Sequence, residues 1–286
     1  MSDIDNSLKF YTHISSKKSW FNLNLREVWR YRDLILLFTK KNFVVTYKQT
    51  ILGPLWIFLN PFLTSLIYTF VFGGIAGIGT DGIPQILFYL CGSALWTFFS
   101  TSVTKNAQTF TANANVFGKV YFPRLTTPIS NVLASIIQFA VQMILVVVFL
   151  IYYVYRGDVK PHWELMIFIP FILLHLGLLG LGCGIIISSL TTKYRDLAIL
   201  VTFGVQLWMY ATPVVYPISQ LGDGIMRTII MINPVTAPFE TFRHIILGQG
   251  YISLQNSLLS FGITLGIALI GIMIFNRVEK TFMDTV

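Results

Sequence analysis

Charged residues are scarce in this chain of 286 amino acids. Asp, Glu, Lys and Arg make up 11% of it, against roughly 25% in soluble domains, and 55% of the residues are hydrophobic. This composition excludes an ordinary soluble domain and indicates a membrane protein with several spans. There are two cysteines, Cys91 and Cys183. Both lie inside apolar runs, which favours small core residues over a disulfide or a metal pair.

Motifs for nucleotide binding and catalysis are also missing. The chain has no HExxH, no CxxC and no GxxxxGK[ST] phosphate-binding loop, because Gly118-Lys119 is followed by Val120 and lacks the upstream glycine. We therefore expect no ATP site of this type, no catalytic residue and no metal site. The predicted spans hold no acidic residue, which disfavours an ion-coupled carrier. Residues 1–33 are polar and mixed in charge, so no cleavable signal peptide is expected.

Long apolar runs dominate what is present. They predict an all-α membrane protein with six transmembrane helices, at about residues 52–72, 86–109, 129–153, 165–190, 198–216 and 254–275. Residues 217–250 are apolar only in pieces, so short re-entrant helices at the outer surface are expected there. We divide the chain into an N-terminal cytoplasmic arm (1–24), an interface helix (25–48) and a six-span domain (49–286).

Positive charge indicates the orientation of these spans. Sixteen of the twenty Lys and Arg residues fall on the side that holds both termini, and the other four are Arg156, Lys160, Arg227 and Arg243. Because Lys and Arg accumulate on the cytoplasmic side, both termini are predicted to be cytoplasmic. The net charge of +8 therefore reflects the flanks of the spans, and no nucleic-acid partner is expected.

The interface helix at 25–48 mixes basic and apolar residues. Its longest uninterrupted apolar run, 34–38, is far shorter than the ~20 residues that a span needs. An amphipathic helix at the cytoplasmic interface is therefore favoured over a helix of a soluble domain, because no such domain surrounds it.

Polar residues recur inside two of the predicted spans. They recur every fourth residue. In the first span they are Trp56, Asn60, Thr64 and Tyr68, and in the fifth they are Thr202, Gln206 and Tyr210. Polar groups need partners in lipid. The stripes alone favour helix-to-helix contacts, with the wall of a hydrated pathway as the alternative.

Other residues predict packing or local pairing. His175 is expected to be a hydrogen-bonded core residue and not a proton relay. The small-residue series Gly177, Gly180, Gly182 and Gly184 predicts close helix packing. Glu240 and Arg243, three residues apart, predict a helical ion pair worth a few tenths of a kcal/mol.

The segment between the second and third predicted spans, at 113–124, concentrates charge and aromatic rings in a chain that has little charge. It contains Phe117, Lys119, Tyr121, Phe122 and Arg124. We interpret it as the surface that docks a soluble motor.

A succession of motifs resembles the permease subunits of ABC exporters of the type-2 class. The motifs are YRDL (31–34), YKQTILGPLW (47–56), KVYFPR (119–124), KYRDL (193–197) leading to TPVVYP, NP (233–234) and ETFRHIILG (240–248). The resemblance covers residues 26–286, and YKQxxLGxLW together with YFPR is specific in combination. Within this class the chain looks similar to the branch that exports lipid-linked O-antigen, capsule or teichoic-acid polysaccharides.

The resemblance implies a homodimer in the bacterial inner membrane, bound to two ATP-binding-cassette subunits that hold ATP and Mg²⁺. It also implies a lipid-linked polysaccharide as the substrate, a channel at the dimer interface, a coupling helix at about 113–121 and a gate at 25–48. The residues that match are Trp56, Asn60, Tyr68, Gln206, Trp208 and Tyr210 for the channel, Arg32, Lys40, Lys41, Tyr47 and Lys48 for the gate and lipid phosphate, and Asn115, Phe117, Lys119, Tyr121, Phe122 and Arg124 for ATPase coupling.

Two alternatives stay open. An exporter of drugs or small lipids would share the architecture but lack a continuous aromatic channel. A membrane-embedded transferase acting on a polyprenyl lipid would need metal-binding carboxylates or a base near the interface, and Asp33 and Asp196, each within a YRDL motif, are the candidates.

Overall fold

The computed structural model describes residues 25–48, 51–192, 194 and 196–285, so the arm predicted at 1–24 lies outside the described residues. The described chain forms helices and no strands, which confirms the all-α class. The α-helices are α1 (Leu25–Arg30), α2 (Arg32–Tyr47), α3 (Trp56–Tyr68), α4 (Gln85–Ala107), α5 (Thr109–Phe117), α6 (Thr126–Tyr155), α7 (Ile169–Thr191), α8 (Leu197–Tyr210), α9 (Ile225–Ile232), α10 (Thr236–Leu247) and α11 (Leu254–Thr285). Shorter helical turns occupy Gly53–Leu55, Thr69–Ile75, Trp163–Phe168 and Ile218–Gln220.

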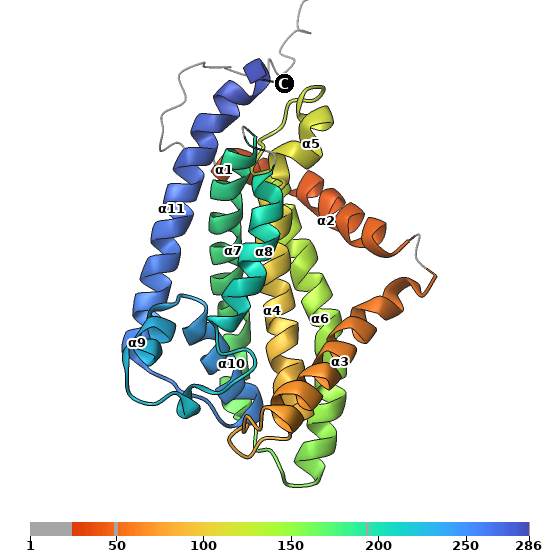
Figure 1. Ribbon diagram of the computed structural model, residues 1–286. Helices are drawn as coiled ribbons and strands as arrows, with labels where there is room; N and C mark the ends of the chain where they lie inside the picture. The colour runs from red at the N-terminus through yellow and green to blue at the C-terminus, as the bar shows by residue number, and fades with distance from the viewer. Residues whose placement is uncertain (1–24, 49–50, 193, 195, 286) are drawn as a thin grey trace, which may run out of the picture.

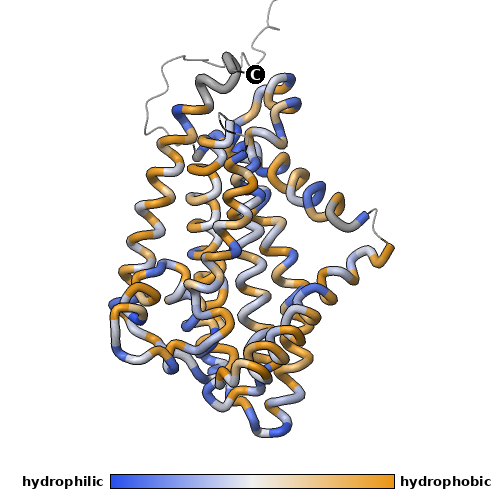
Figure 2. The backbone as a smooth tube through the Cα atoms, in the orientation of Figure 1, coloured by the Kyte–Doolittle hydropathy of each residue, from blue (hydrophilic) through white to orange (hydrophobic). Residues whose placement is uncertain are grey.

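The helices form a bundle with distinct ends. α4, α6, α7 and α8 run side by side through its centre, α11 flanks α7, and α2 and α3 lie on the opposite side (Figure 1). α5 and the C-terminal part of α11 mark one end, which we call the α5 end, whereas α9 and α10 mark the other, the α10 end. Hydrophobic residues cover most of the length of the helices between these ends (Figure 2).

α4 is the centre of this bundle. In its most apolar stretch 78% of the residues are buried, whereas the corresponding value for Gly53–Ile75, which contains α3, is 17%. The rings of Tyr89, Phe98 and Phe99 on α4 are all at most 1% exposed. α3 therefore leaves most of its surface uncovered in a single chain.

The glycine series of α7 allows its close packing. A methyl group on Gly180 would lie 2.8 Å from Cβ of Ser102 on α4, and one on Gly182 would lie 2.9 Å from Cα of Ala268 on α11. Gly184 lies directly against Asn106 of α4. The prediction of close helix packing is confirmed, because α7 meets α4 on one face and α11 on the other.

Five described segments are long and apolar enough to cross a membrane: Gly53–Ile75, Gln85–Ala107, Thr126–Tyr155, Trp163–Thr191 and Leu254–Val278. The fifth predicted span corresponds to α8, whose 14 residues extend over about 21 Å, less than the ~30 Å of a hydrocarbon core. α8 ends at Tyr210 and not at the predicted residue 216. Pro213 explains the early end, because it has no backbone N–H to donate to a continuing helix.

Other boundaries also differ from the prediction. A turn at Tyr31 divides the predicted interface helix into α1 and α2, and the helix expected at about 113–121 begins earlier, at Thr109. Two short helices, α9 and α10, form within residues 217–250 as expected. Gly248 ends α10 in the left-handed conformation, with φ of 74°, which is the usual role of glycine after a helix.

Candidate functional site

The segment predicted to couple to a partner consists of α5 and the stretch that follows it. We call residues 109–124 the docking segment. Phe117 and Phe122 face inward, with 4% and 5% exposure and ring centroids 5.6 Å apart. They belong to an apolar cluster with Val28, Ile35, Phe110, Leu125, Ile185 and Phe275. The sequence placed both rings among the coupling residues, but the structure shows that they support the segment from within.

The outer surface of the docking segment carries Asn115, Lys119 and Tyr121, which are all exposed. Tyr121 is 68% exposed, and its hydroxyl lies 3.5 Å from Oε1 of Glu27 on α1, so α1 borders the same surface. Arg124 is half-buried and its guanidinium carbon lies 5.6 Å from the centroid of the Phe117 ring. Tyrosine and arginine are enriched where proteins bind one another, so this surface suits a protein partner.

α7 holds the root of the docking segment. The Ser188 hydroxyl accepts a hydrogen bond from the backbone N–H of Phe110 at 3.2 Å. The Thr191 hydroxyl donates to the carbonyl of Ala107 at 3.0 Å. Both contacts fix the junction between α4 and α5, and the segment is therefore anchored to the bundle at its start.

α2 carries the residues predicted for the gate. Arg32, Lys40 and Lys41 on this helix are exposed, and so is Lys48, which follows it. The side chain of Tyr47 lies outside the described residues. Leu36, Leu37 and Val45 on the same helix are also exposed. Basic and apolar residues side by side on an exposed helix are typical of a membrane interface.

Three asparagines connect α2, α6 and α4 next to the docking segment. Asn42 Nδ2 donates to Asn131 Oδ1 at 2.8 Å, and Asn131 Nδ2 donates to Asn106 Oδ1 at 3.0 Å. We call these three residues the amide chain. Asn131 is 7% exposed and Asn106 is fully buried. Sequence reasoning missed this site, although amides within apolar helices were a signal, because the paired residues are 89 and 25 positions apart.

Two helices expose residues that were predicted for a channel. Trp56 and Asn60 on α3 and Gln206 and Tyr210 on α8 are all exposed. Amide side chains on apolar helices need a polar partner or water when the surroundings are lipid. These faces are uncovered in a single chain.

Tyr68 and Trp208 are less accessible than the other channel candidates. The Tyr68 hydroxyl lies 3.3 Å from the sulfur of Met209, which brings the end of α3 against α8. Trp208 Nε1 donates to Asn233 Oδ1 at 3.1 Å, and its ring meets the Phe99 ring edge-on with centroids 5.2 Å apart. Trp208 thus lies apart from the exposed stripe of α8.

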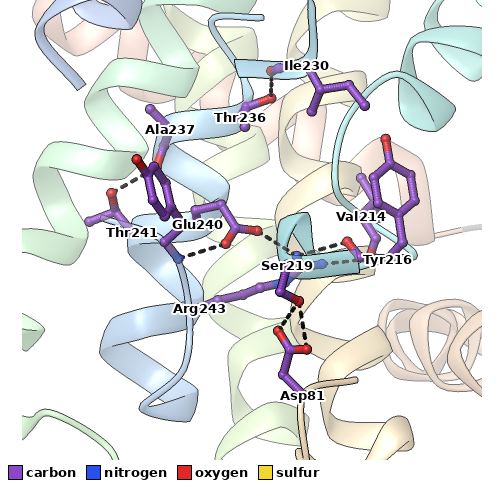
Figure 3. Close-up of polar contacts among 11 residues, drawn as sticks. Asp81, Val214, Tyr216, Ser219, Ile230, Thr236, Ala237, Glu240, Thr241 and Arg243 are labelled. Carbon is purple, nitrogen blue, oxygen red and sulfur yellow. Dashed lines mark hydrogen bonds and ion pairs between the residues drawn. The ribbon is translucent and has the colours of Figure 1, made fainter. Parts of the chain in front are cut away.

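The α10 end contains a buried charged group, shown in Figure 3. Arg243 Nη1 donates to Glu240 Oε1 at 2.9 Å, and Nη2 donates to the Val214 carbonyl at 2.8 Å. The guanidinium carbon lies 4.0 Å from the centroid of the Phe88 ring on α4. Glu240 Oε2 accepts the backbone N–H of Tyr251 at 2.9 Å. We call Glu240, Arg243 and these partners the ion-pair cluster, which joins α10 to α4 and to the chain on either side.

The Glu240–Arg243 pair predicted from spacing is confirmed, but its surroundings differ from the expectation. The two residues are only 3% and 2% exposed. Burial lowers the pKa of the Arg243 guanidinium from its ordinary value, and the Glu240 carboxylate opposes that shift. The predicted value of a few tenths of a kcal/mol applies to an exposed pair, whereas removing one partner of a buried pair costs about 3–5 kcal/mol.

The other single residues behave as packing elements. His175 Nε2 lies 2.9 Å from the Thr264 hydroxyl and 3.2 Å from the Ser260 hydroxyl, which confirms a hydrogen-bonded core position between α7 and α11. Cys91 and Cys183 are free thiols, as predicted.

The two carboxylates that the transferase alternative requires are exposed. Asp33 stands at the start of α2, 4.0 Å from Arg32 Nε, and Asp196 directly precedes α8. They belong to separate elements.

The chain that forms this α-helical bundle matches a known family. Residues 33–247 match the ABC-2 type transporter family, and the chain belongs to that family. The resemblance drawn from the motifs is therefore confirmed.

Curated relatives cover nearly the whole chain. The O-antigen export system permease protein RfbA of Klebsiella pneumoniae is 31% identical over 257 residues, which are 88% of this chain and 94% of that protein. A protein of the same name from Myxococcus xanthus is 30% identical over 223 residues, which are 77% of this chain and 83% of the relative.

Proposed function

We propose that this chain is the permease of an ATP-driven exporter that moves a lipid-linked polysaccharide across the inner membrane of a bacterium. The observation that carries the proposal is its similarity to O-antigen export permeases along 94% of the length of one of them. ATP and Mg²⁺ bind to a separate ATP-binding-cassette subunit in this proposal, because the chain contains no phosphate-binding loop.

The docking segment is the proposed attachment point for that ATPase. Its outer residues Asn115, Lys119 and Tyr121 are exposed at the α5 end, while Phe117 and Phe122 anchor it in the apolar cluster. Because its base is anchored, the docking segment passes a movement of the ATPase on to the helix bundle. This role requires the α5 end to face the cytoplasm, which agrees with the distribution of Lys and Arg.

A second copy of the chain is the proposed cover for α3 and α8. The segment that contains α3 is the least buried of the five candidate spans, and Asn60 and Gln206 expose amides on otherwise apolar helices. A channel at the dimer interface would give these amides water and polar sugar groups as partners. The exposed rings of Trp56 and Tyr210 supply flat surfaces on which the C–H faces of sugar rings stack.

The exposed cations of α2 suit the lipid end of the substrate. Lys40, Lys41 and Lys48 are exposed beside apolar residues, so they attract the pyrophosphate of a lipid carrier at the inner leaflet. In the proposed cycle, ATP binding closes the ATPase subunits, the docking segment moves with them, and α2, α3 and α8 shift to open the channel. α9 and α10 border its outer mouth.

The test is deletion of the gene in its native bacterium. We expect surface polysaccharide to disappear and lipid-linked chains to accumulate on the inner leaflet, and plasmid-borne wild-type protein to restore export. Unchanged surface polysaccharide would contradict the proposal. Export of a drug or a small lipid without any polysaccharide defect would favour the first alternative, and sugar transfer by the purified chain alone would favour the second.

A further inference from the structure

The amide chain lies where both ends of the docking segment meet. Asn106 precedes α5 by three residues, and Asn131 follows the start of α6 by five. Their hydrogen bond therefore joins the end of α4 to the start of α6, on either side of the docking segment. Asn131 Nδ2 also lies 3.4 Å from the Lys105 carbonyl. Asn42 attaches α2 to the same residue, so Asn131 is the point shared by α4, α6 and α2.

This connection differs from the apolar contacts between α2 and the docking segment. The rings of Phe38 and Phe122 meet edge-on, with centroids 5.7 Å apart. Apolar contacts are not directional, so they permit sliding. Amide hydrogen bonds require a defined distance and angle, and they therefore fix the register of α2 against α6. Thr39 lies on the same face of α2 and reaches the carbonyl of Ser130 at 3.5 Å.

The side-chain amide of Asn106 also has a hydrogen-bond donor that is not used. Its Nδ2 is buried and has no hydrogen-bond partner in the described part of the chain. A buried donor without a partner is costly, so an arrangement of the helices that supplies a partner to Asn106 would be stabilised.

We propose that Asn131 is the positioning residue that passes a displacement of the docking segment to α2. The inference rests on the proposed function and adds to it the part of the permease that couples the ATPase to the gate. The displacement of the docking segment reaches Asn131 through its hydrogen bond with Asn106. α2 follows because Asn42 is bonded to Asn131.

The test measures both movements in one complex. Pairs of spin labels report the distance between the two copies of α5, at Ala112, and between the two copies of α2, at Leu37, in a background with Cys91 and Cys183 replaced by alanine. We expect ATP with vanadate to change both distances in the wild-type background. Asn131→Leu should keep the change at α5 and lose the change at α2, and export per ATP hydrolysed should fall about fivefold to tenfold, as for one or two lost hydrogen bonds.

Two further variants keep the test decisive. Asn42→Leu removes the hydrogen bond between α2 and Asn131 and leaves the Asn131–Asn106 bond in place, so it should give the same result even if Asn131→Leu fails to fold. Gln138→Leu likewise replaces an amide side chain with leucine, two turns along α6 and outside the amide chain, and should leave both distance changes intact. In the double variant Asn42→Leu/Asn131→Leu, the loss should be no greater than in Asn131→Leu alone.

A full change at α2 in both Asn131→Leu and Asn42→Leu would overturn the inference. A different result would contradict the proposed function itself: a wild-type chain that binds no ATPase, or in which ATP changes neither distance.

Discussion

The two ends of the molecule stabilise their buried polar groups in different ways. At the α10 end, Glu240 and Arg243 form a charged pair with hydrogen bonds to Val214 and Tyr251, and the guanidinium lies over the Phe88 ring of α4. At the α5 end, the neutral amide chain joins three separate helices. The first set is ionic, and its hydrogen bonds stay within residues 214–251, whereas the second is neutral and joins three helices.

The difference follows from the cost of breaking each set. Removing one partner of a buried ion pair costs about 3–5 kcal/mol, so such a pair suits a part of the molecule that stays fixed. A neutral hydrogen bond contributes about 0.5–1.5 kcal/mol, which is within reach of a conformational change driven by ATP. The comparison therefore assigns a static role to the ion-pair cluster and a moving role to the amide chain.

The largest effect is expected for Arg243→Leu. It leaves the Glu240 carboxylate buried without a partner, and the free energy of unfolding should fall by about 3–5 kcal/mol. Thermal unfolding of the purified chain in detergent measures this loss. The double variant Glu240→Leu/Arg243→Leu should be more stable than the single one, since no charge is then left buried. Equal unfolding temperatures for Arg243→Leu and the wild type would contradict the static role of the ion-pair cluster.

Tyr121→Asp should weaken binding of the ATPase without unfolding the permease. Tyr121 is 68% exposed on the docking segment, and loss of a central tyrosine at a protein interface costs about 2 kcal/mol or more. The measurement is the amount of ATPase that co-purifies with the chain. Tyr155→Asp is the matched control, because Tyr155 is 91% exposed and ends α6 at the α10 end. Equal loss in both variants would contradict the assignment of the docking segment.

Gly184→Ala should destabilise the contact between α7 and α4. A methyl group there would meet Asn106 and would lie 2.9 Å from the Val103 carbonyl, and overpacking of this kind costs about 1–3 kcal/mol. Gly262→Ala is the control, because a methyl group at Gly262 would meet no atom within 4 Å. Unfolding temperatures should fall for the first variant and not for the second. The reverse order would show that α7 and α4 do not pack as described.

The smallest effect is expected at the ion pair of Asp223 and Arg227, four residues apart, in which Asp223 is exposed and Arg227 is half-buried. The Asp223 side chain is 94% exposed, so Asp223→Ala should change the free energy of unfolding by about 0.5 kcal/mol or less. The same thermal assay provides the comparison with Arg243→Leu. A loss as large as that of the buried variant would mean that burial does not distinguish the two pairs.

Boundaries set by local chemistry were accessible from the sequence. The two short helices of residues 217–250 were predicted where α9 and α10 form, because Gly224, Pro234 and Gly248 interrupt the apolar pieces. The end of α8 was placed six residues too late, although Pro213 was a signal, because the run stays apolar to Tyr216. The Glu240–Arg243 spacing predicted the pair itself.

Features that depend on distant contacts were not accessible. Periodicity did not reveal that Phe117 and Phe122 are buried, because the residues that cover them come from α1, α2, α7 and α11. The burial of Arg243 depends on Phe88 and Val214, which lie 155 and 29 residues earlier in the chain. The amide chain likewise pairs residues whose proximity only the folded bundle creates.

The central claim is that the α5 end moves while the α10 end stays fixed. Hydrogen exchange of the reconstituted complex, measured by mass spectrometry with and without ATP and vanadate, tests it directly. Exchange should change in residues 32–45 and 105–131 and stay constant in α10, where the ion-pair cluster holds the helix. A change confined to α10, with the docking segment and α2 unaltered, would contradict the account.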